Sequence, residues 1–347
     1  MKKITNISFI CLIVIIIFAS TYGEGIHGLI KLSGVDCYLS IILSTILSLP
    51  TLYIFNCLFN YEPSLNIFEK NKKLFKNPLI PNTIIILFAF LVAIIQMFNL
   101  TNFLVSQFLT ETDPLIIGII FTILLIYLCT KDTSTLCKIS SIILPINLLL
   151  FITALIGILP QFKIDNLLPF LEYGLKNPIL GSIYIFLINI CPIFFILLIP
   201  KDKVTNFKTK NIYIAYTIYF ILSIITTIFT IGTLGINLSK LYQYPEYILL
   251  RRFNFFDFLT RMENILFLQW IFGLFIFIGL CTITIKEQLK FKYNHIIISI
   301  LILFVSLKGF KTLTLFNEFT YYIYPYISLI FLLFIIIIFI KTKRKPN

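Results

Sequence analysis

The stretch Tyr22, Gly23, Glu24 and Gly25 places a carboxylate between two glycines inside the first long apolar run of the chain. An ionisable side chain at bilayer depth is costly and is tolerated where it faces other helices or a cavity. Irregular backbone obeys the same restriction, because lipid cannot satisfy its polar groups. The sequence therefore predicts that the first helix is interrupted here. We expect Gly23, Glu24 and Gly25 to line a small-molecule binding site.

Glu24 suits two kinds of chemistry. As a carboxylate it can hold a ligand ammonium or a cation, and as a carboxylic acid it can carry a coupling proton. The alternative is a wetted, structural glutamate near the outer end of its helix. Motifs of soluble enzymes, such as HExxH, GxSxG and the phosphate-binding glycine loop, are absent from the sequence, and only two histidines occur. We therefore expect a protein that is not an enzyme and binds neither metal nor cofactor.

Polar residues in two later apolar runs are candidates for the same site. Gln96 and Asn99 recur at near-helical spacing in one run, and Asn189, Cys191 and Pro192 interrupt another. We expect Gln96, Asn99, Asn189 and Cys191 to contact the ligand. Pro192 is expected to shape a bend, since proline removes a helical hydrogen bond. For the Gln96 stripe, hydrogen bonding between helices is the alternative.

The composition decides the class of protein. The 347 residues are 59% hydrophobic and 12% charged, against about 25% charged residues in soluble domains. We predict an all-α integral membrane protein with one polytopic domain over residues 1–347. Its apolar runs predict about ten transmembrane helices, near 4–32 (interrupted), 37–58, 82–109, 114–130, 139–160, 179–200, 211–236, 260–285, 293–309 and 318–340.

The basic residues predict the orientation. Of the 28 lysines and arginines, 19 fall in segments that share one side of the membrane with the N-terminus. The positive-inside rule then places both termini in the cytoplasm. Two connections are more than turns. Residues 59–81 suggest a surface helix or a solvated basic loop, and residues 238–259 suggest either a membrane-surface anchor or a short helix closing over the outer mouth.

The two interrupted helices occupy equivalent places in the chain. Five helices (about 4–160) form a first half, and five more (about 179–340) form a second, so the breaks fall in the first and the sixth helix. Broken helices at equivalent positions indicate an inverted-repeat transporter with a binding site near the membrane midplane. Free backbone groups and half-helix dipoles then hold a small ligand without many charged side chains.

One stretch resembles a known family. It runs from Tyr244, Pro245 and Glu246 through Arg252 to Asp257, Arg261, Glu263 and Trp270. It is similar to the spore germination permease family, which comprises the B subunits of germinant receptors within the amino acid/polyamine/organocation transporter superfamily. The resemblance implies a LeuT-like 5+5 inverted repeat in the spore inner membrane, with broken helices 1 and 6.

The resemblance also implies a ligand and partners. The ligand would be a small germinant, typically an amino acid, and the partners would be receptor A and C subunits. Structural or gating roles are expected for a set of residues in or near the broken helices and the matching stretch: Pro192, Tyr244, Pro245, Arg252, Arg261 and Glu263. The sequence departs from the family at Thr260, where an acidic residue is expected, and at Cys191 and Pro192, where many relatives carry a small residue and a glutamate. These departures leave the identity of the ligand open.

Two functions follow from these observations. The first is a germinant-sensing, permease-like subunit that binds its ligand between helices 1, 3, 6 and 8. The alternative is a proton-coupled amino acid permease. A membrane acyltransferase is disfavoured, because the sequence lacks a pattern of catalytic histidine and acid.

Overall fold

The computed structural model describes residues 3–172, 174–252, 263–289 and 291–344. Its α-helices are α1 (Asn6–Thr21), α2 (Glu24–Ser33), α3 (Cys37–Asn60), α4 (Ile67–Leu74), α5 (Leu79–Gln107), α6 (Pro114–Cys129), α7 (Thr133–Ile158), α8 (Lys176–Ile190), α9 (Lys210–Leu241), α10 (Pro245–Leu250), α11 (Glu263–Gln288), α12 (Asn294–Gly309), α13 (Leu313–Glu318) and α14 (Tyr324–Arg344). Shorter 3₁₀ turns occur at Gly34–Asp36, Leu159–Gln161, Ile164–Leu167, Cys191–Leu198 and Lys201–Lys203, and a π-helical turn at Phe319–Ile323. The described residues form no β-strand, apart from an isolated bridge between Ile4 and Val204.

The chain is an integral membrane protein. Within the described ranges, seven segments are long and apolar enough to cross a bilayer: Glu24–Asn60, Leu79–Gln107, Thr133–Gln161, Lys176–Leu198, Lys210–Leu241, Trp270–Gln288 and Leu313–Arg344. Three further apolar helices, α1, α6 and α12, are shorter, with 16 residues each. The count of ten spans depends on these three and stays a prediction.

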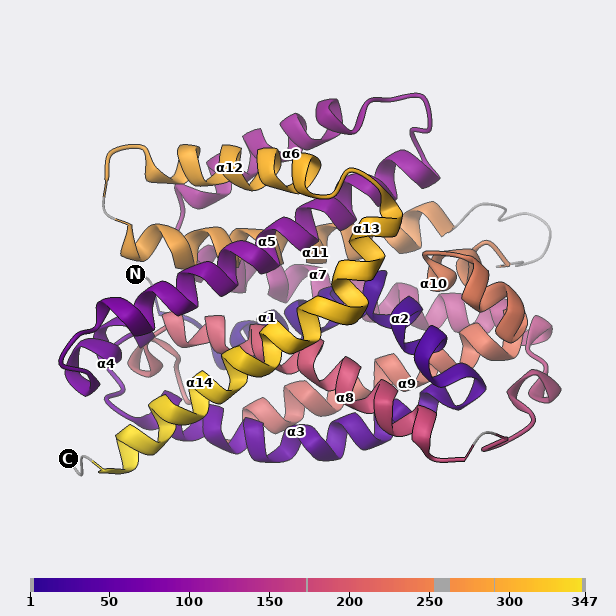
Figure 1. Ribbon diagram of the computed structural model, residues 1–347, viewed down its shortest axis with the longest axis horizontal. Helices are drawn as coiled ribbons and strands as arrows, with labels where there is room; N and C mark the ends of the chain where they lie inside the picture. The colour runs from indigo at the N-terminus through magenta and orange to yellow at the C-terminus, as the bar shows by residue number, and fades with distance from the viewer. Residues whose placement is uncertain (1–2, 173, 253–262, 290, 345–347) are drawn as a thin grey trace.

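The helices run side by side along the long axis of the molecule (Figure 1). The start of α1, the end of α14 and the short helix α4 lie at one end, while α2 and α10 lie toward the other (Figure 1). Helix α1 packs against α7, α9 and α11, and its residues from Cys11 to Ile17 are all buried. A helix that is apolar on every side belongs inside a bundle. Helix α1 is thus the central element of the core.

Both expected interruptions exist, in different forms. Helix α1 ends at Thr21 and α2 begins at Glu24, with Gly23 between them at φ +77°. Helix α8 ends at Ile190, and the chain continues as a 3₁₀ helix from Cys191 to Leu198 with Pro192 in its first turn. The first interruption is a break in the helix axis, whereas the second is a change of helix type.

The connection over residues 59–81 contains a helix, α4, which begins with a capping box between Asn66 and Glu69. Its apolar side chains Ile67, Phe68 and Leu74 are buried, and the helix contacts α5 and α14. Its apolar side therefore packs on the protein itself.

Lys70 on α4 closes the end of α3. Its side chain is 2% exposed, and Nζ donates to the carbonyl oxygen of Leu58 at 2.7 Å and to that of Phe59 at 3.5 Å. These carbonyls belong to the last turn of α3, where helical partners are missing. Burial lowers the pKa of Lys70 to about 8.

We predict that Lys70→Met lowers the stability of the protein by about 1–3 kcal/mol, because it leaves buried carbonyls without a donor. The exposed Lys72→Met on the same helix is the matched control and should have little effect. Thermal unfolding in detergent measures both.

The same variant tests the protonation of Lys70. Because its pKa is lower in the folded protein, the unfolded chain binds more protons between pH 8 and pH 10.5, so this residue's contribution to stability rises with pH. The difference in melting temperature between wild type and Lys70→Met should therefore grow between pH 7 and pH 9.5. A constant or shrinking difference would contradict the lowered pKa.

Candidate functional site

Glu24 is the first residue of α2, and its side chain is completely buried. Its carboxylate accepts hydrogen bonds from Gln96 Nε2, at 2.9 Å, and from Asn99 Nδ2, both on α5. Its backbone carbonyl accepts one from the Tyr184 hydroxyl on α8, at 3.0 Å. A helix N-terminus also favours a negative side chain. The structure therefore brings three predicted residues, Glu24, Gln96 and Asn99, into one cluster.

The Glu24 cluster presents hydrogen-bond acceptors to its surroundings. Beside the carboxylate, the amide oxygens Gln96 Oε1 and Asn99 Oδ1 are buried and have no hydrogen-bond partner among the described residues. A buried acceptor without a donor costs free energy. A group that brings several N–H donors, such as an ammonium, matches this set of oxygens.

A second buried carboxylate lies at the break. The backbone N–H of Gly23 donates to Glu246 Oε1 on α10, and Glu246 is only 1% exposed. For residues 238–259 the sequence predicts either a membrane-surface anchor or a short helix over the outer mouth, and Glu246 enters that prediction only as part of the resembling stretch. The signal that it is buried was the apolar and aromatic character of its neighbours Tyr244, Tyr247 and Leu249, all of which are buried.

Asn189 lies on the other side of the break. Its Oδ1 accepts from Ser20 Oγ at 3.2 Å and from Thr21 Oγ1 at 3.1 Å, in the last turn of α1. Its Nδ2 donates to the Tyr219 hydroxyl on α9. Helix α8 thus binds both sides of the break, through Asn189 to α1 and through Tyr184 to α2.

Gly25 belongs to the first turn of α2 and leaves no room for a larger residue. A Cβ atom built on it would lie 3.0 Å from the carbonyl oxygen of Ser20 and 3.5 Å from Ile185. The small residue at this position therefore lets α2 approach both α1 and α8.

Two predicted residues lie outside these clusters. Cys191 is buried, and its thiol contacts the carbonyl oxygen of Ser328 on α14 at 3.2 Å. Pro192 sits in the first turn of the 3₁₀ helix. Both shape the contact between the sixth predicted helix and α14. In the described structure neither has a hydrogen bond to the Glu24 cluster.

The other predicted gating residues lie in or near the connection between α9 and α11. Tyr244 precedes α10 and is buried, and its hydroxyl accepts from Asn102 Nδ2 at 2.8 Å. Pro245 is the first residue of α10. Arg252 is exposed, and its carbonyl accepts from Gln161. Arg261 and the side chain of Glu263 lie outside the described residues, as does Asp257.

His27, for which the sequence predicted no role in the site, joins α2 to the π-helical turn before α14. His27 Nδ1 lies 2.5 Å from the Tyr321 hydroxyl, in the π-helical turn, and Nε2 lies 3.3 Å from the carbonyl oxygen of Lys240. Single-turn π segments inside helices often occur at functional sites. The contact fixes the first part of α2 against two other elements.

The fold and the break define an all-helical membrane protein with an interrupted first helix. Residues 3–295 match the model of the spore germination protein family, and the chain belongs to this family. It is also 24% identical over 224 residues to Spore germination protein XB of Bacillus anthracis. That alignment covers 64% of this chain and 62% of the relative, so the chain matches less than two thirds of that protein's length. The predicted family resemblance is confirmed.

We predict that Gly23→Ala destabilises the protein more than Gly34→Ala. Both glycines have a positive φ, +77° and +63°, with a negative ψ, and a non-glycine residue in such a sparsely populated conformation costs about 1–3 kcal/mol. A Cβ on Gly23 would also lie 2.8 Å from the Asn99 amide nitrogen, whereas nothing lies within 4 Å of one on Gly34. Thermal unfolding of the two variants compares the costs.

The double variant Gly23→Ala/Asn99→Ala separates crowding from backbone strain. Gly23→Ala should cost less in an Asn99→Ala background than in wild type, because the crowding amide is then absent; the Asn99→Ala single variant is the baseline, since it also removes a donor to Glu24. Equal melting temperatures for Gly23→Ala and Gly34→Ala would show that Asn99 does not crowd this position.

Proposed function

We propose that this chain is the germinant-sensing, permease-like subunit of a spore germination receptor. It binds a small molecule such as an amino acid at a midplane site between helices 1, 3, 6 and 8 of a ten-helix, LeuT-like bundle. The observation that carries the proposal is the buried Glu24 carboxylate, which Gln96 and Asn99 hold at the break of the first helix. Membership of the spore germination protein family supports the same conclusion.

The chemistry of the cluster selects the ligand group. The buried Glu24 carboxylate and the amide oxygens of Gln96 and Asn99, which have no donor among the described residues, form a set of acceptors, and a ligand ammonium carries the donors that this set lacks. Gly23 and Gly25 let the broken backbone approach its neighbours closely, Gly23 beside Asn99 and Gly25 beside Ser20. The ligand therefore meets Glu24 through its ammonium and the broken backbone through its remaining polar atoms.

The contacts of α8 suggest how binding is passed on. Tyr184 holds α2 and Asn189 holds α1, so any change in the angle between α1 and α2 changes at least one of these contacts. Helix α8 then continues into the 3₁₀ helix that packs on α14. Ligand binding would shift this set of helices, and receptor A and C subunits would receive the signal.

The placement in the membrane follows from charge. The described ends of the chain and α4 lie at the same end of the molecule (Figure 1). The sequence places 19 of the 28 lysines and arginines on that side. We therefore propose that this end faces the cytoplasm and that α10 faces the opposite side of the spore inner membrane.

A proton-coupled amino acid permease is the second candidate, favoured by a titratable carboxyl group within a membrane-spanning segment. Uptake separates the two functions. The purified chain in proteoliposomes, with a proton gradient imposed, should show no accumulation of labelled amino acid if sensing is its function. Gradient-driven uptake by this chain alone would favour the permease.

We predict that Glu24→Gln raises the germinant concentration for half-maximal germination at least tenfold, because it removes the charge that faces the ligand ammonium. Tenfold corresponds to about 1.4 kcal/mol. The measurement is the fall in optical density of spores that carry the variant, tested over a panel of amino acids and other small germinants. Protein abundance in the spore membrane is measured in parallel.

Glu111→Gln, in the exposed turn between α5 and α6, is the matched control and should respond as wild type. An unchanged dose response of Glu24→Gln to the cognate germinant would rule out a role for Glu24 in reading the ligand.

A further inference from the structure

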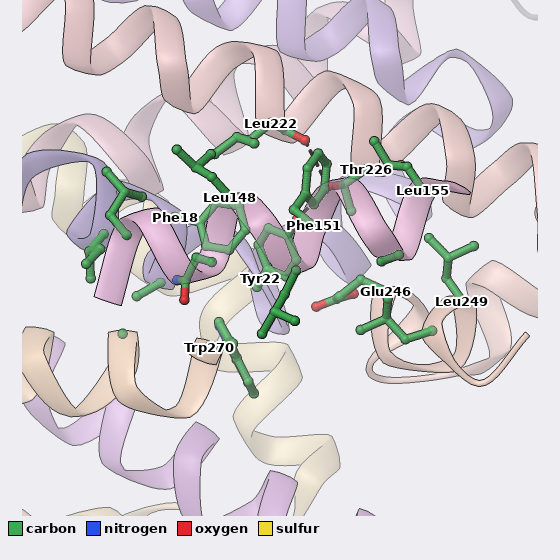
Figure 2. Close-up of a pocket in the computed structure, with 18 of the residues that line it drawn as sticks. Phe18, Tyr22, Leu148, Phe151, Leu155, Leu222, Thr226, Glu246, Leu249 and Trp270 are labelled. Atoms are coloured by element: carbon green, nitrogen blue, oxygen red, sulfur yellow. Dashed lines mark hydrogen bonds between the residues drawn. The ribbon is translucent and has the colours of Figure 1, made fainter. Parts of the chain in front are cut away.

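A mostly apolar pocket lies beside the break, between α1, α7, α9, α10 and α11 (Figure 2). Its volume is about 80 Å³. Aliphatic and aromatic side chains form most of its walls, among them Phe18, Leu148, Phe151, Leu222 and Leu249. Protein interiors rarely leave voids much larger than a water molecule. A pocket of this size next to the broken helix therefore has room for a ligand.

One carboxylate faces this apolar pocket. Glu246 points from α10 into the space beside Tyr22 (Figure 2). Its Oε1 accepts from the Gly23 N–H, but its Oε2 is buried and has no hydrogen-bond partner among the described residues. A buried carboxylate is costly unless a cation or further donors satisfy it. Glu246 Oε2 is thus a defined atom in this pocket that lacks a hydrogen-bond donor.

The other polar side chains that line the pocket, those of Tyr22, Asn147, Thr226 and Trp270, form no hydrogen bond with Glu246 Oε2. The hydroxyls of Tyr22 and Thr226 bond to each other at 2.5 Å. Among the described residues that line the pocket, none is lysine, arginine or histidine. A ligand carboxylate would find no cation here, whereas a ligand ammonium would find Glu246 and its alkyl group would find the apolar walls.

We propose that this pocket binds a small primary alkylammonium, with Glu246 as its counter-ion. The volume is about half that of a 150 Å³ cavity that holds benzene, which leaves space for roughly three carbon atoms. The site is separate from the Glu24 carboxylate, which binds α5, and it goes beyond the function proposed above.

The route by which a ligand would enter the pocket lies on the side of the helix bundle, past α7. Leu148, Phe151 and Leu155 line the pocket from α7 and are partly exposed. Helix α7 is part of a candidate membrane span, and the exposed side chains next to these, such as Ile152 and Ile156, are also apolar. An alkyl chain that enters here passes through apolar surroundings until its ammonium reaches Glu246.

The pocket contains its own reporter, because Trp270 lines it and is the only tryptophan in the chain. The experiment titrates purified full-length protein in detergent with n-propylamine at neutral pH and follows tryptophan emission. We expect a saturable change with n-propylamine and none with n-propanol, which has the same chain length but no charge. Glu246→Gln should weaken binding at least tenfold, and the exposed Glu111→Gln should leave it unchanged.

Ala154→Leu provides a second variant that keeps the carboxylate. Ala154 is a buried residue of the α7 wall, so a leucine there fills the space and should abolish the saturable change. If Glu246→Gln does not fold, as shown by the lack of a cooperative unfolding transition, the binding measured for Ala154→Leu tests the proposal instead. Equal saturation with n-propanol, undiminished binding in Glu246→Gln, or undiminished binding in Ala154→Leu would each overturn the proposal. The titration uses no germinant, so its failure leaves the role of Glu24 untouched.

Discussion

The hydrogen bonding of the broken backbone between α1 and α2 constrains the rest of the structure. Polar backbone groups at bilayer depth need partners within the protein, because lipid offers none. The Gly23 N–H is satisfied by Glu246 on α10, and the Glu24 carbonyl by Tyr184 on α8. The Gly23 carbonyl accepts from the His27 N–H at 3.2 Å within α2. The break therefore fixes the positions of two other helices as well as its own.

The break itself was predictable from the sequence, because Gly-Glu-Gly stands out against an apolar run. The pairing of Glu24 with Gln96 and Asn99 was predictable only in part. Residues three apart lie on one helix face, so Gln96 and Asn99 are expected to point toward the same neighbouring element. That they meet Glu24 depends on how α5 packs against the break. The alternatives of helix–helix bonding and ligand contact are not exclusive here, since the bond from α5 is made to the candidate site residue.

The burial of Glu246 could not be predicted from sequence periodicity. The residue follows a proline in a short connection where aromatic and apolar residues precede two arginines, a pattern that fits a membrane-surface segment as well as a buried one. Its burial arises from tertiary structure: α10 turns back against α9 and also contacts α2, α7 and α11. For Cys191, by contrast, helix geometry did limit where the side chain could point. Cys191 lies two residues after Asn189, and residues two apart do not share a helix face, so one of them had to point elsewhere. Cys191 turns to α14.

Two carboxylates thus flank one glycine, in different surroundings. Glu24 faces amide groups of α5, whereas Glu246 faces apolar walls and holds the Gly23 N–H. A cation bound by Glu246 would compete with that N–H for the negative charge and weaken its hold on the break. A ligand at Glu24 acts on the next residue of the same backbone. If both proposed sites bind their ligands, any coupling through this glycine is reciprocal, because linkage requires each ligand to change the affinity of the other by the same factor.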